Sequence, residues 1–140
     1  MIDFVYNTDF RLANKEVFSR WLISVASSEG FLIDTLVFLF VDDAEILQMN
    51  NKFLKHDYYT DVITFGDLKD KKISGDIAIS IERVLDNSKT YGVELEDELK
   101  RVMVHGLLHI MGYNDKDSND KSVMSQKEKK AIKMFHVKQL

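Results

Sequence analysis

Residues 94–117 read ELEDELKRVMVHGLLHIMGYNDKD, and this stretch carries the most informative pattern in the chain. Its apolar positions recur three or four residues apart, as they do on one face of a helix: Leu95, Leu99, Val102, Gly106 and Ile110. The spacing predicts a helix over about residues 95–111 that packs this face on a hydrophobic core. Gly112 then fits the left-handed residue that commonly ends a helix and lets the chain turn back.

Two histidines lie at the edge of that apolar face. His105 and His109 are four residues apart, and at this spacing two side chains project from the same side of a helix. Both imidazoles can therefore reach a single metal ion, and Asp115, six residues beyond His109, could bring a third ligand from the turn. Three protein ligands leave a coordination position open, which is typical of catalytic rather than structural zinc sites.

Two buried histidines can also be ordinary core residues whose nitrogens bond to backbone carbonyls. Gly106 favours the metal site, because Gly in mid-helix costs about 1 kcal/mol relative to Ala, and its absent side chain suggests a group that approaches closely. Gly106 also stands where His-Glu-x-x-His zinc proteases carry their general base. A peptidase would lack that base here. The sequence therefore favours hydrolysis of a phosphodiester, in which a metal ion lowers the pKa of water and acts on a phosphoryl oxygen.

The composition limits what else the protein can be. The chain has 140 residues, and we expect a single domain over residues 1–140. It contains no Cys, so thiolate metal sites are excluded and a metal ion must be held by His, Asp or Glu. The longest apolar run, residues 36–41, is too short to span a bilayer. The N-terminal MIDFVYNTDF has no signal-peptide pattern, so we expect a cytoplasmic protein.

Charge is distributed unevenly along the chain. The net charge of −4 argues against a protein that coats nucleic acid in bulk. Residues 116–140, however, hold seven Lys against three acidic residues. A basic C-terminal helix can bind RNA phosphates, although a solvated helix face explains the same charges.

The remaining segments predict a mixed α/β (or α+β) fold. Strands are expected at residues 2–6, 32–41, 61–65 and 77–81. Helices are expected at residues 15–28, 44–54, 82–91, 95–111 and 119–137. Asn14 and either Asp42 or Asp43 are predicted N-caps, Gly30 is a predicted helix stop, and residues 66–75 are predicted to connect a hairpin. This order predicts a small mixed sheet of four strands packed with about five to six helices.

Three blocks of the chain match the patterns of one known family. The pattern His-Gly-x-x-His-x-x-Gly-Tyr-Asp-His is matched at His105, Gly106, His109, Gly112 and Tyr113. The block Asn-x-x-Tyr-Arg-x-x-Asp-x-x-Thr-Asp-Val-Leu-Ser-Phe is matched at Asn50, Asp57, Thr60, Asp61, Val62 and Phe65. The block Gly-Asp-Ile is matched at Gly75, Asp76 and Ile77. Through these residues the chain, from about residue 30 to 130, resembles the YbeY family of bacterial endoribonucleases and ribosomal RNA maturation factors.

The resemblance implies a core in which the metal-bearing helix is like that of zinc endopeptidases. It implies one zinc ion as cofactor, single-stranded RNA as substrate, trimming at the 3′ end of small-subunit (16S) ribosomal RNA, and contact with the small ribosomal subunit. Neither DNA nor a membrane is expected as a partner. His105, His109 and Asp115 are then the expected zinc ligands, and the two histidines belong to the expected catalytic site.

Two positions depart from the family pattern. The third metal-binding His of the family falls on Asp115, and Asp is a competent zinc ligand. Three nearby residues are rival ligands without the right spacing: Asn114, Asp117 and Asp120. The family's Arg, a phosphate or substrate contact, falls on Leu54. Lys55 or His56, next along the chain, could take this catalytic role or be an ordinary solvated side chain.

The remaining candidates each have a functional and a structural interpretation. Thr60 and Asp61 could orient a ligand or the substrate, or could cap the start of a strand. Three aromatic residues could stack on RNA bases or pack in the core, namely Tyr58, Tyr59 and Tyr113. His136 is expected to be a surface or packing residue. Two other functions stay open: a metalloprotease, and a non-catalytic zinc-binding ribosome-assembly factor.

Overall fold

Four strands and five helices make up the described part of the chain. The structure is a computed structural model that describes residues 1–54 and 60–139. The strands are β1 (Ile2–Tyr6), β2 (Leu32–Val41), β3 (Val62–Lys69) and β4 (Lys72–Ser80). The helices are α1 (Lys15–Ser28), α2 (Asp43–Leu54), α3 (Ile81–Tyr91), α4 (Leu95–Ile110) and α5 (Ser118–Gln139). The predicted fold class, a small sheet packed with helices, is confirmed.

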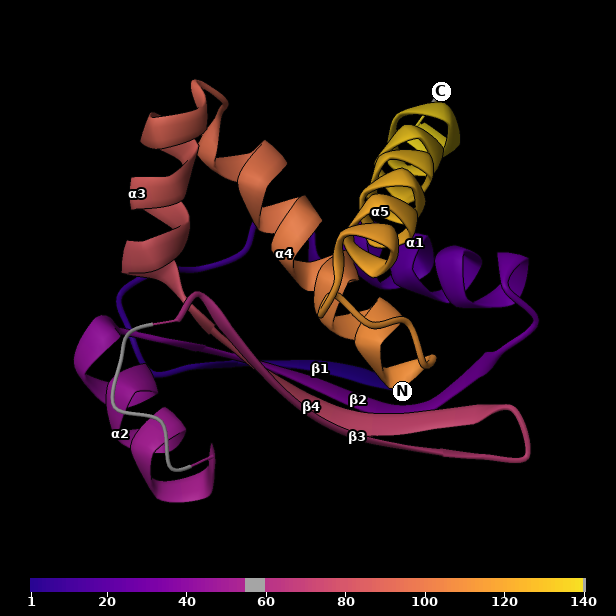
Figure 1. The fold of residues 1–140 in the computed structure, drawn as a ribbon. Coiled ribbons are helices and arrows are strands. Elements are labelled where there is room, and N and C mark those ends of the chain that lie inside the picture. Colours follow the sequence, from indigo (N-terminus) through magenta and orange to yellow (C-terminus); the bar gives the residue numbers. More distant parts are fainter. Residues whose placement is uncertain (55–59, 140) are drawn as a thin grey trace.

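The sheet is mixed, with the strand order β1-β2-β4-β3. β1 and β4 both run parallel to β2, whereas β3 pairs antiparallel with β4 and forms one edge. The central strand β2 is rich in apolar residues because helices cover the sheet on both faces, and Phe38 and Phe40 are fully buried. Figure 1 shows the turn of the long β3–β4 hairpin at one end of the sheet.

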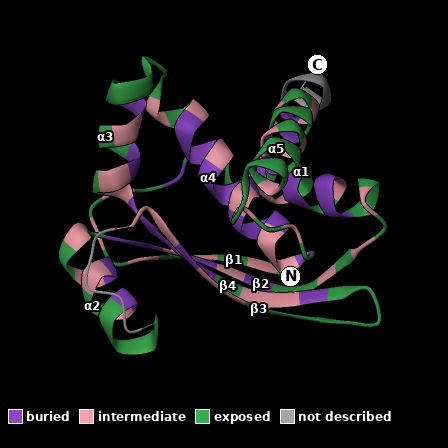
Figure 2. Ribbon diagram, in the orientation of Figure 1, coloured by how far each residue is buried: buried purple, intermediate pink, exposed green. Residues whose placement is uncertain are grey.

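Helices cover the two faces of the sheet unequally (Figure 1). α1, α4 and α5 lie over one face, and Figure 2 shows buried residues along these helices. The large core includes Trp21, Leu107 and Phe135. α2 lies against the opposite face, where Ile46 belongs to a smaller cluster. Among the residues described, no helix is both long enough and apolar enough to cross a bilayer.

α4 lies close against the sheet at Gly106. A Cβ atom at this position would lie 2.9 Å from Cγ2 of Ile77 on β4 and 3.2 Å from Oγ1 of Thr64 on β3. The close packing recurs one turn later, where the side chain of Ile110 fills the space beside Gly66. The group that approaches Gly106 is therefore the side chain of Ile77 rather than a ligand, and the absent Cβ brings α4 down onto β3 and β4.

The β3–β4 hairpin is longer than predicted. The prediction of a connection over residues 66–75 is wrong, because β3 continues to Lys69 and β4 begins at Lys72. Only Asp70 and Lys71 form the turn, and their φ angles of 53° and 66° are of the kind that a two-residue type I′ turn requires. Residues 66–69 are exposed, so this part of β3 lacks the apolar alternation by which a half-buried strand is identified.

The predicted helix ends are partly confirmed. Oδ1 of Asp42 accepts a hydrogen bond from the backbone N–H of Glu45 at 2.9 Å and so caps α2. Gly30 follows α1 with a φ of 87°, as expected. Asn14 precedes α1, but its side chain makes no cap hydrogen bond. Its backbone is left-handed (φ 59°), whereas a side-chain cap requires an extended residue, and its carbonyl oxygen accepts from Val17 instead.

Candidate metal centre

Three side chains with metal-ligating atoms meet at the C-terminal end of α4. His105 and His109 project from its last turns, and Gly112 (φ 109°) turns the chain so that Asp115 returns to them. Nε2 of His105 lies 3.1 Å from Nε2 of His109 and 3.3 Å from Oδ2 of Asp115. Nε2 of His109 lies 3.4 Å from the same Oδ2 atom. The structure thus brings the three predicted ligands together.

These separations fit a zinc ion. Bonds from zinc to nitrogen or oxygen are about 2.0–2.2 Å long, so two ligands of a tetrahedral ion are about 3.3–3.6 Å apart. The observed triangle has edges of 3.1, 3.3 and 3.4 Å. Three such donors occupy three corners of a tetrahedron and leave the fourth for water or substrate. Within residues 1–54 and 60–139, this is the group of His and acidic side chains that could share an ion.

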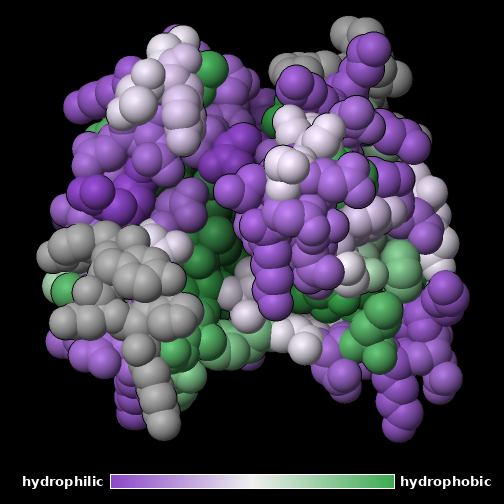
Figure 3. Space-filling view, in the orientation of Figure 1, coloured by the Kyte–Doolittle hydropathy of each residue, from purple (hydrophilic) through white to green (hydrophobic). Residues whose placement is uncertain are grey.

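The three side chains line an open cleft of about 480 Å³ between α4 and β3. Its wall also includes Leu54 at the end of α2, and Thr60 and Asp61 just before β3. Figure 3 shows this face of the molecule, which is hollowed between two lobes and has apolar atoms within the hollow. No Lys or Arg occurs among the described residues that line the cleft. An anionic substrate would therefore find neither a Lys nor an Arg side chain in the described part of the wall.

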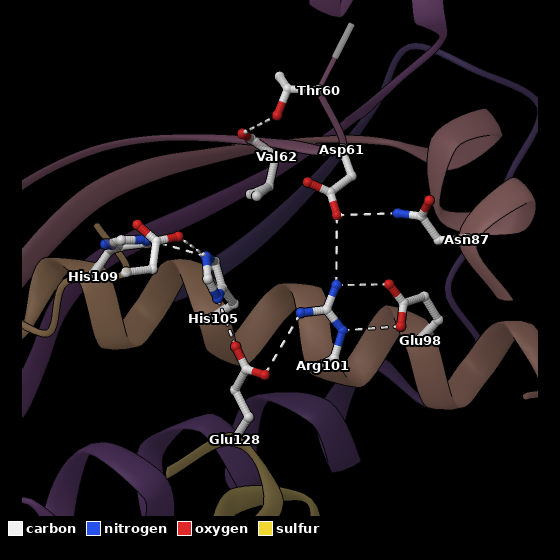
Figure 4. Close-up of polar contacts among 10 residues, drawn as sticks. Thr60, Asp61, Val62, Asn87, Glu98, Arg101, His105, His109 and Glu128 are labelled. Carbon is white, nitrogen blue, oxygen red and sulfur yellow. Dashed lines mark hydrogen bonds and ion pairs between the residues drawn. The ribbon is translucent and has the colours of Figure 1, made fainter. Parts of the chain in front are cut away.

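A network of charged side chains lies behind His105 (Figure 4). Oε2 of Glu128, on α5, lies 2.6 Å from Nδ1 of His105. Arg101, one turn before His105, donates hydrogen bonds to both carboxylate oxygens of Glu98, at 2.9 and 2.7 Å. The guanidinium group also lies 3.6 Å from a carboxylate oxygen of Glu128 and 3.6 Å from one of Asp61. The hydrogen bond to Glu98 raises the pKa of Arg101, which stays protonated.

Asp61 connects this network to the cleft. Its Oδ2 atom accepts a hydrogen bond from the side-chain amide of Asn87 at 3.3 Å and faces Arg101. Burial raises the pKa of the Asp61 carboxyl above its ordinary value, and the positive charge of Arg101 opposes this only in part. Asp61 therefore takes up a proton more readily than a fully solvated Asp does.

Four predicted candidates lie outside the described residues: Lys55, His56, Tyr58 and Tyr59. Leu54, which directly precedes them, lines the cleft. Thr60 also lines the cleft, and its hydroxyl donates to the carbonyl oxygen of Val62 at 3.3 Å. His136 belongs to the last turns of α5, where the side chains lie outside the described part.

Tyr113 and the rival ligands make other contacts. The hydroxyl of Tyr113 donates to Glu29 of α1 at 2.6 Å, and its ring packs against the core rather than in the wall of the cleft. Oδ1 of Asp117 accepts from the backbone N–H of Asp120 at 2.7 Å and so caps the start of α5. Asn114 is exposed.

Sequence reasoning misses Glu98, Arg101 and Glu128. Glu98 and Glu128 are charged residues within the buried stripe of a helix, which is a signal that the sequence does contain. On α5 the buried stripe is Met124, Glu128, Ala131 and Phe135. A charge in such a stripe destabilises the fold unless it has a partner. The pattern therefore indicates that a partner exists, although it does not identify that partner.

Fold and site together define a small α/β protein with an open cleft and, on and just after a His-x-x-x-His helix, three side chains that could hold a metal ion. The sequence profile of the family described as Endoribonuclease YbeY matches residues 5–136. The chain belongs to this family, and the resemblance inferred from three motifs is confirmed.

Individual relatives agree with the family profile. Endoribonuclease YbeY of Karelsulcia muelleri is 47% identical over 128 residues, which cover 91% of each chain. Endoribonuclease YbeY of Flavobacterium johnsoniae is 45% identical over 139 residues, which cover 99% of this chain and 100% of that one. The solution structure of TM1509 from Thermotoga maritima has a similar fold, with a TM-score of 0.68 at 24% identity. That match covers 96% of this chain and 89% of that chain.

Proposed function

We propose that this protein is a zinc-dependent endoribonuclease that cuts single-stranded RNA. One observation carries the proposal: in a member of the YbeY family, two imidazoles and a carboxylate converge at tetrahedral spacing in an open cleft. We further propose that it acts in the cytoplasm on the 3′ end of small-subunit (16S) ribosomal RNA, in contact with the small ribosomal subunit. The resemblance of its motifs to the family supports this part.

In this proposal His105, His109 and Asp115 hold the ion. Zinc bound there supplies Lewis acidity towards water and towards a phosphoryl oxygen. The two imidazoles bind as neutral donors, whereas the carboxylate of Asp115 brings a negative charge. This donor set leaves less positive charge on the ion than three imidazoles would, so we expect the substrate phosphate to depend on a further cation.

Lys55 and His56 are the proposed source of that cation. They directly follow Leu54, which lines the cleft, and the described part of the wall holds no Lys or Arg. A positively charged side chain at this point would bind a phosphate oxygen by a charge-assisted hydrogen bond. Thr60 and Asp61, on the wall before β3, are proposed to orient the substrate.

The experiment is cleavage of a fluorescently labelled RNA by the purified full-length chain. We expect the single-stranded form to be cut, the same sequence in a duplex to stay intact, and a chelator to stop cleavage until zinc is restored. Lys55→Ala or His56→Ala should lower the rate about tenfold or more, because a charge that stabilises the transition state is lost. Lys69→Ala, at the far end of β3, is the matched control and should retain full activity.

Other outcomes would point to other functions. A fully zinc-loaded protein that never cuts single-stranded RNA would contradict the nuclease and favour a non-catalytic assembly factor. Cleavage of casein that a chelator stops would favour a metalloprotease. Gly106 argues against this last outcome, because it leaves no acidic side chain where zinc proteases of the His-Glu-x-x-His kind carry one.

A further inference from the structure

Glu128 is a buried charge that the proposed chemistry does not use directly. Only 7% of its surface is exposed, and it lies in the buried stripe of α5 between Met124 and Ala131. Its Oε2 atom lies 2.6 Å from Nδ1 of His105, and its Oε1 atom lies 3.6 Å from Nη1 of Arg101. A buried carboxylate needs hydrogen bonds or opposite charges to replace its hydration. For Glu128 these partners are His105 and Arg101, and both belong to α4, the helix that carries the proposed metal-binding histidines.

The contact with His105 determines which ring nitrogen carries the proton. An ionised carboxylate can only accept hydrogen bonds, so Nδ1 of His105 donates to Glu128. In a neutral imidazole the other nitrogen, Nε2, then carries a lone pair. Nε2 is the atom that lies 3.1 Å from His109 and 3.3 Å from Asp115. Glu128 thus presents His105 to the other two donors in the form that binds a cation.

Arg101 holds Glu128 in this position. Its guanidinium group is itself oriented by two hydrogen bonds to Glu98, at 2.9 and 2.7 Å. The same group faces Glu128 on one side and Asp61, in the wall of the cleft, on the other (Figure 4). One guanidinium group therefore faces three carboxylates, which come from α4, from α5 and from the segment before β3.

We propose that Glu128 is a positioning residue of the metal centre: it fixes the tautomer and the ring orientation of His105, and Arg101 keeps Glu128 in place. The inference rests on the proposed function, because it concerns the metal site of that enzyme. Partners of this kind behind a metal-binding histidine typically change metal affinity by about 10- to 100-fold. An ion pair that serves only the fold would leave zinc affinity unchanged.

The test compares Glu128→Leu and Glu128→Gln with wild type and with a matched control, Asp43→Asn. Leu removes the acceptor and suits the apolar stripe of α5, whereas Gln keeps the shape and a neutral acceptor. Asp43 accepts from Ser80 at 2.7 Å and from Arg83 at 3.0 Å in a partly buried ion pair, and Asp43 does not line the cleft. The control therefore disrupts a comparable ion pair without touching the metal centre.

Zinc affinity is measured on the metal-free full-length chain by competition with a chromogenic chelator. We expect Glu128→Leu to bind zinc about 10- to 100-fold more weakly. Glu128→Gln should lose less, because its amide oxygen still accepts from Nδ1 of His105. Asp43→Asn should match wild type, since its side chain does not contact the histidines.

A second measurement needs no metal. Nitrogen NMR of the imidazole rings is recorded at about pH 8, above the ordinary His pKa of about 6.5, and reports which nitrogen of His105 carries the proton. We expect the proton on Nδ1 in wild type and mainly on Nε2 in Glu128→Leu. A residue that serves only the fold would not change this signal.

Unchanged zinc affinity together with an unchanged His105 tautomer in Glu128→Leu would overturn the proposal. If that variant does not fold, Glu128→Gln decides the question, and zinc affinity equal to that of wild type would then be the contrary result. A wild-type chain that binds no zinc at all would contradict the proposed function. The tautomer measurement would still report on Glu128 and His105 in that case, so the two failures are distinguishable.

Discussion

Ile77 on β4 packs so closely on Gly106 of α4 that no Cβ atom fits between them. A Cβ atom on Gly106 would lie 2.9 Å from Cγ2 of Ile77. The absence of this Cβ atom lets α4, which carries His105 and His109, pack directly on the sheet. His105 and His109, which flank Gly106 along the helix, consequently reach the same cleft as the residues that begin β3. The short distance between helix and sheet thus helps to place the candidate metal ligands in the cleft.

Gly106→Ala tests this packing. We expect it to lower the free energy of unfolding by up to about 2 kcal/mol, because overpacking costs about 1–3 kcal/mol and helix propensity returns about 1 kcal/mol. Urea denaturation of the metal-free chain measures the change. Ile77→Ala removes the atoms that the new methyl group would meet, so Gly106→Ala should cost less in that background. An equal cost in both backgrounds would show that Ile77 is not the obstacle.

Removal of single ligands tests the metal centre. We expect wild type to hold one zinc ion per chain. His105→Ala, His109→Ala and Asp115→Ala should each bind zinc more than about 100-fold more weakly. Losing a ligand should weaken binding more than losing a hydrogen-bond partner behind a ligand does. Elemental analysis after gel filtration provides the measurement. His136→Ala also removes one imidazole and should keep its zinc. Equal zinc in the His109→Ala variant and in wild type would end the ligand assignment.

Asp61→Asn is expected to show a pH-dependent effect on stability. Because burial raises the pKa of Asp61, the folded state holds this proton more tightly than the unfolded state does. The protonated Asp61 carboxyl therefore makes its full contribution to stability below its pKa in the unfolded chain, about 3.9. This contribution is lost as the pH rises through its pKa in the folded state. Asn does not titrate, so the variant should gain stability relative to wild type as the pH increases from acid to neutral. Urea denaturation of metal-free protein over this range measures the difference, and a flat or falling difference would contradict the prediction.

Tyr113→Phe tests the anchor of the turn that leads to Asp115. The hydroxyl of Tyr113 donates to Glu29 at 2.6 Å, and its loss should cost about 1 kcal/mol at neutral pH. Burial alone would raise the pKa of Glu29, but hydrogen bonds from Tyr113 and Lys127 outweigh this effect and lower it. A carboxyl whose pKa is lower in the folded state stabilises the fold at pH values above its pKa in the unfolded chain. This stabilisation is lost as the pH falls through its pKa in the folded state. The cost of Tyr113→Phe should therefore shrink in acid, and a thermal denaturation series checks this; a cost that grows in acid would contradict it.

Much of the fold follows from local patterns. The apolar spacing of α4 identifies a helix with one buried face, and the apolar, β-branched run of β2 identifies a strand whose second half is largely buried. The sequence predicts only the part of the β3–β4 hairpin that lies away from its turn. The strand ends next to the turn are exposed, and the turn residues, Asp70 and Lys71, are not the usual Asn-Gly pair. Local sequence thus predicts an element well where apolar residues mark its burial, and poorly where the element is exposed.

The sequence by itself determined the three candidate ligands of this protein, because His105, His109 and Asp115 are neighbours along one helix and its following turn, where spacing dictates geometry. Only the tertiary structure decided what surrounds them. Glu128 lies 23 residues from His105, and Ile77 comes from a strand that precedes α4. Contacts between separate elements depend on how helices and strands pack together, and no periodicity within either element encodes that arrangement.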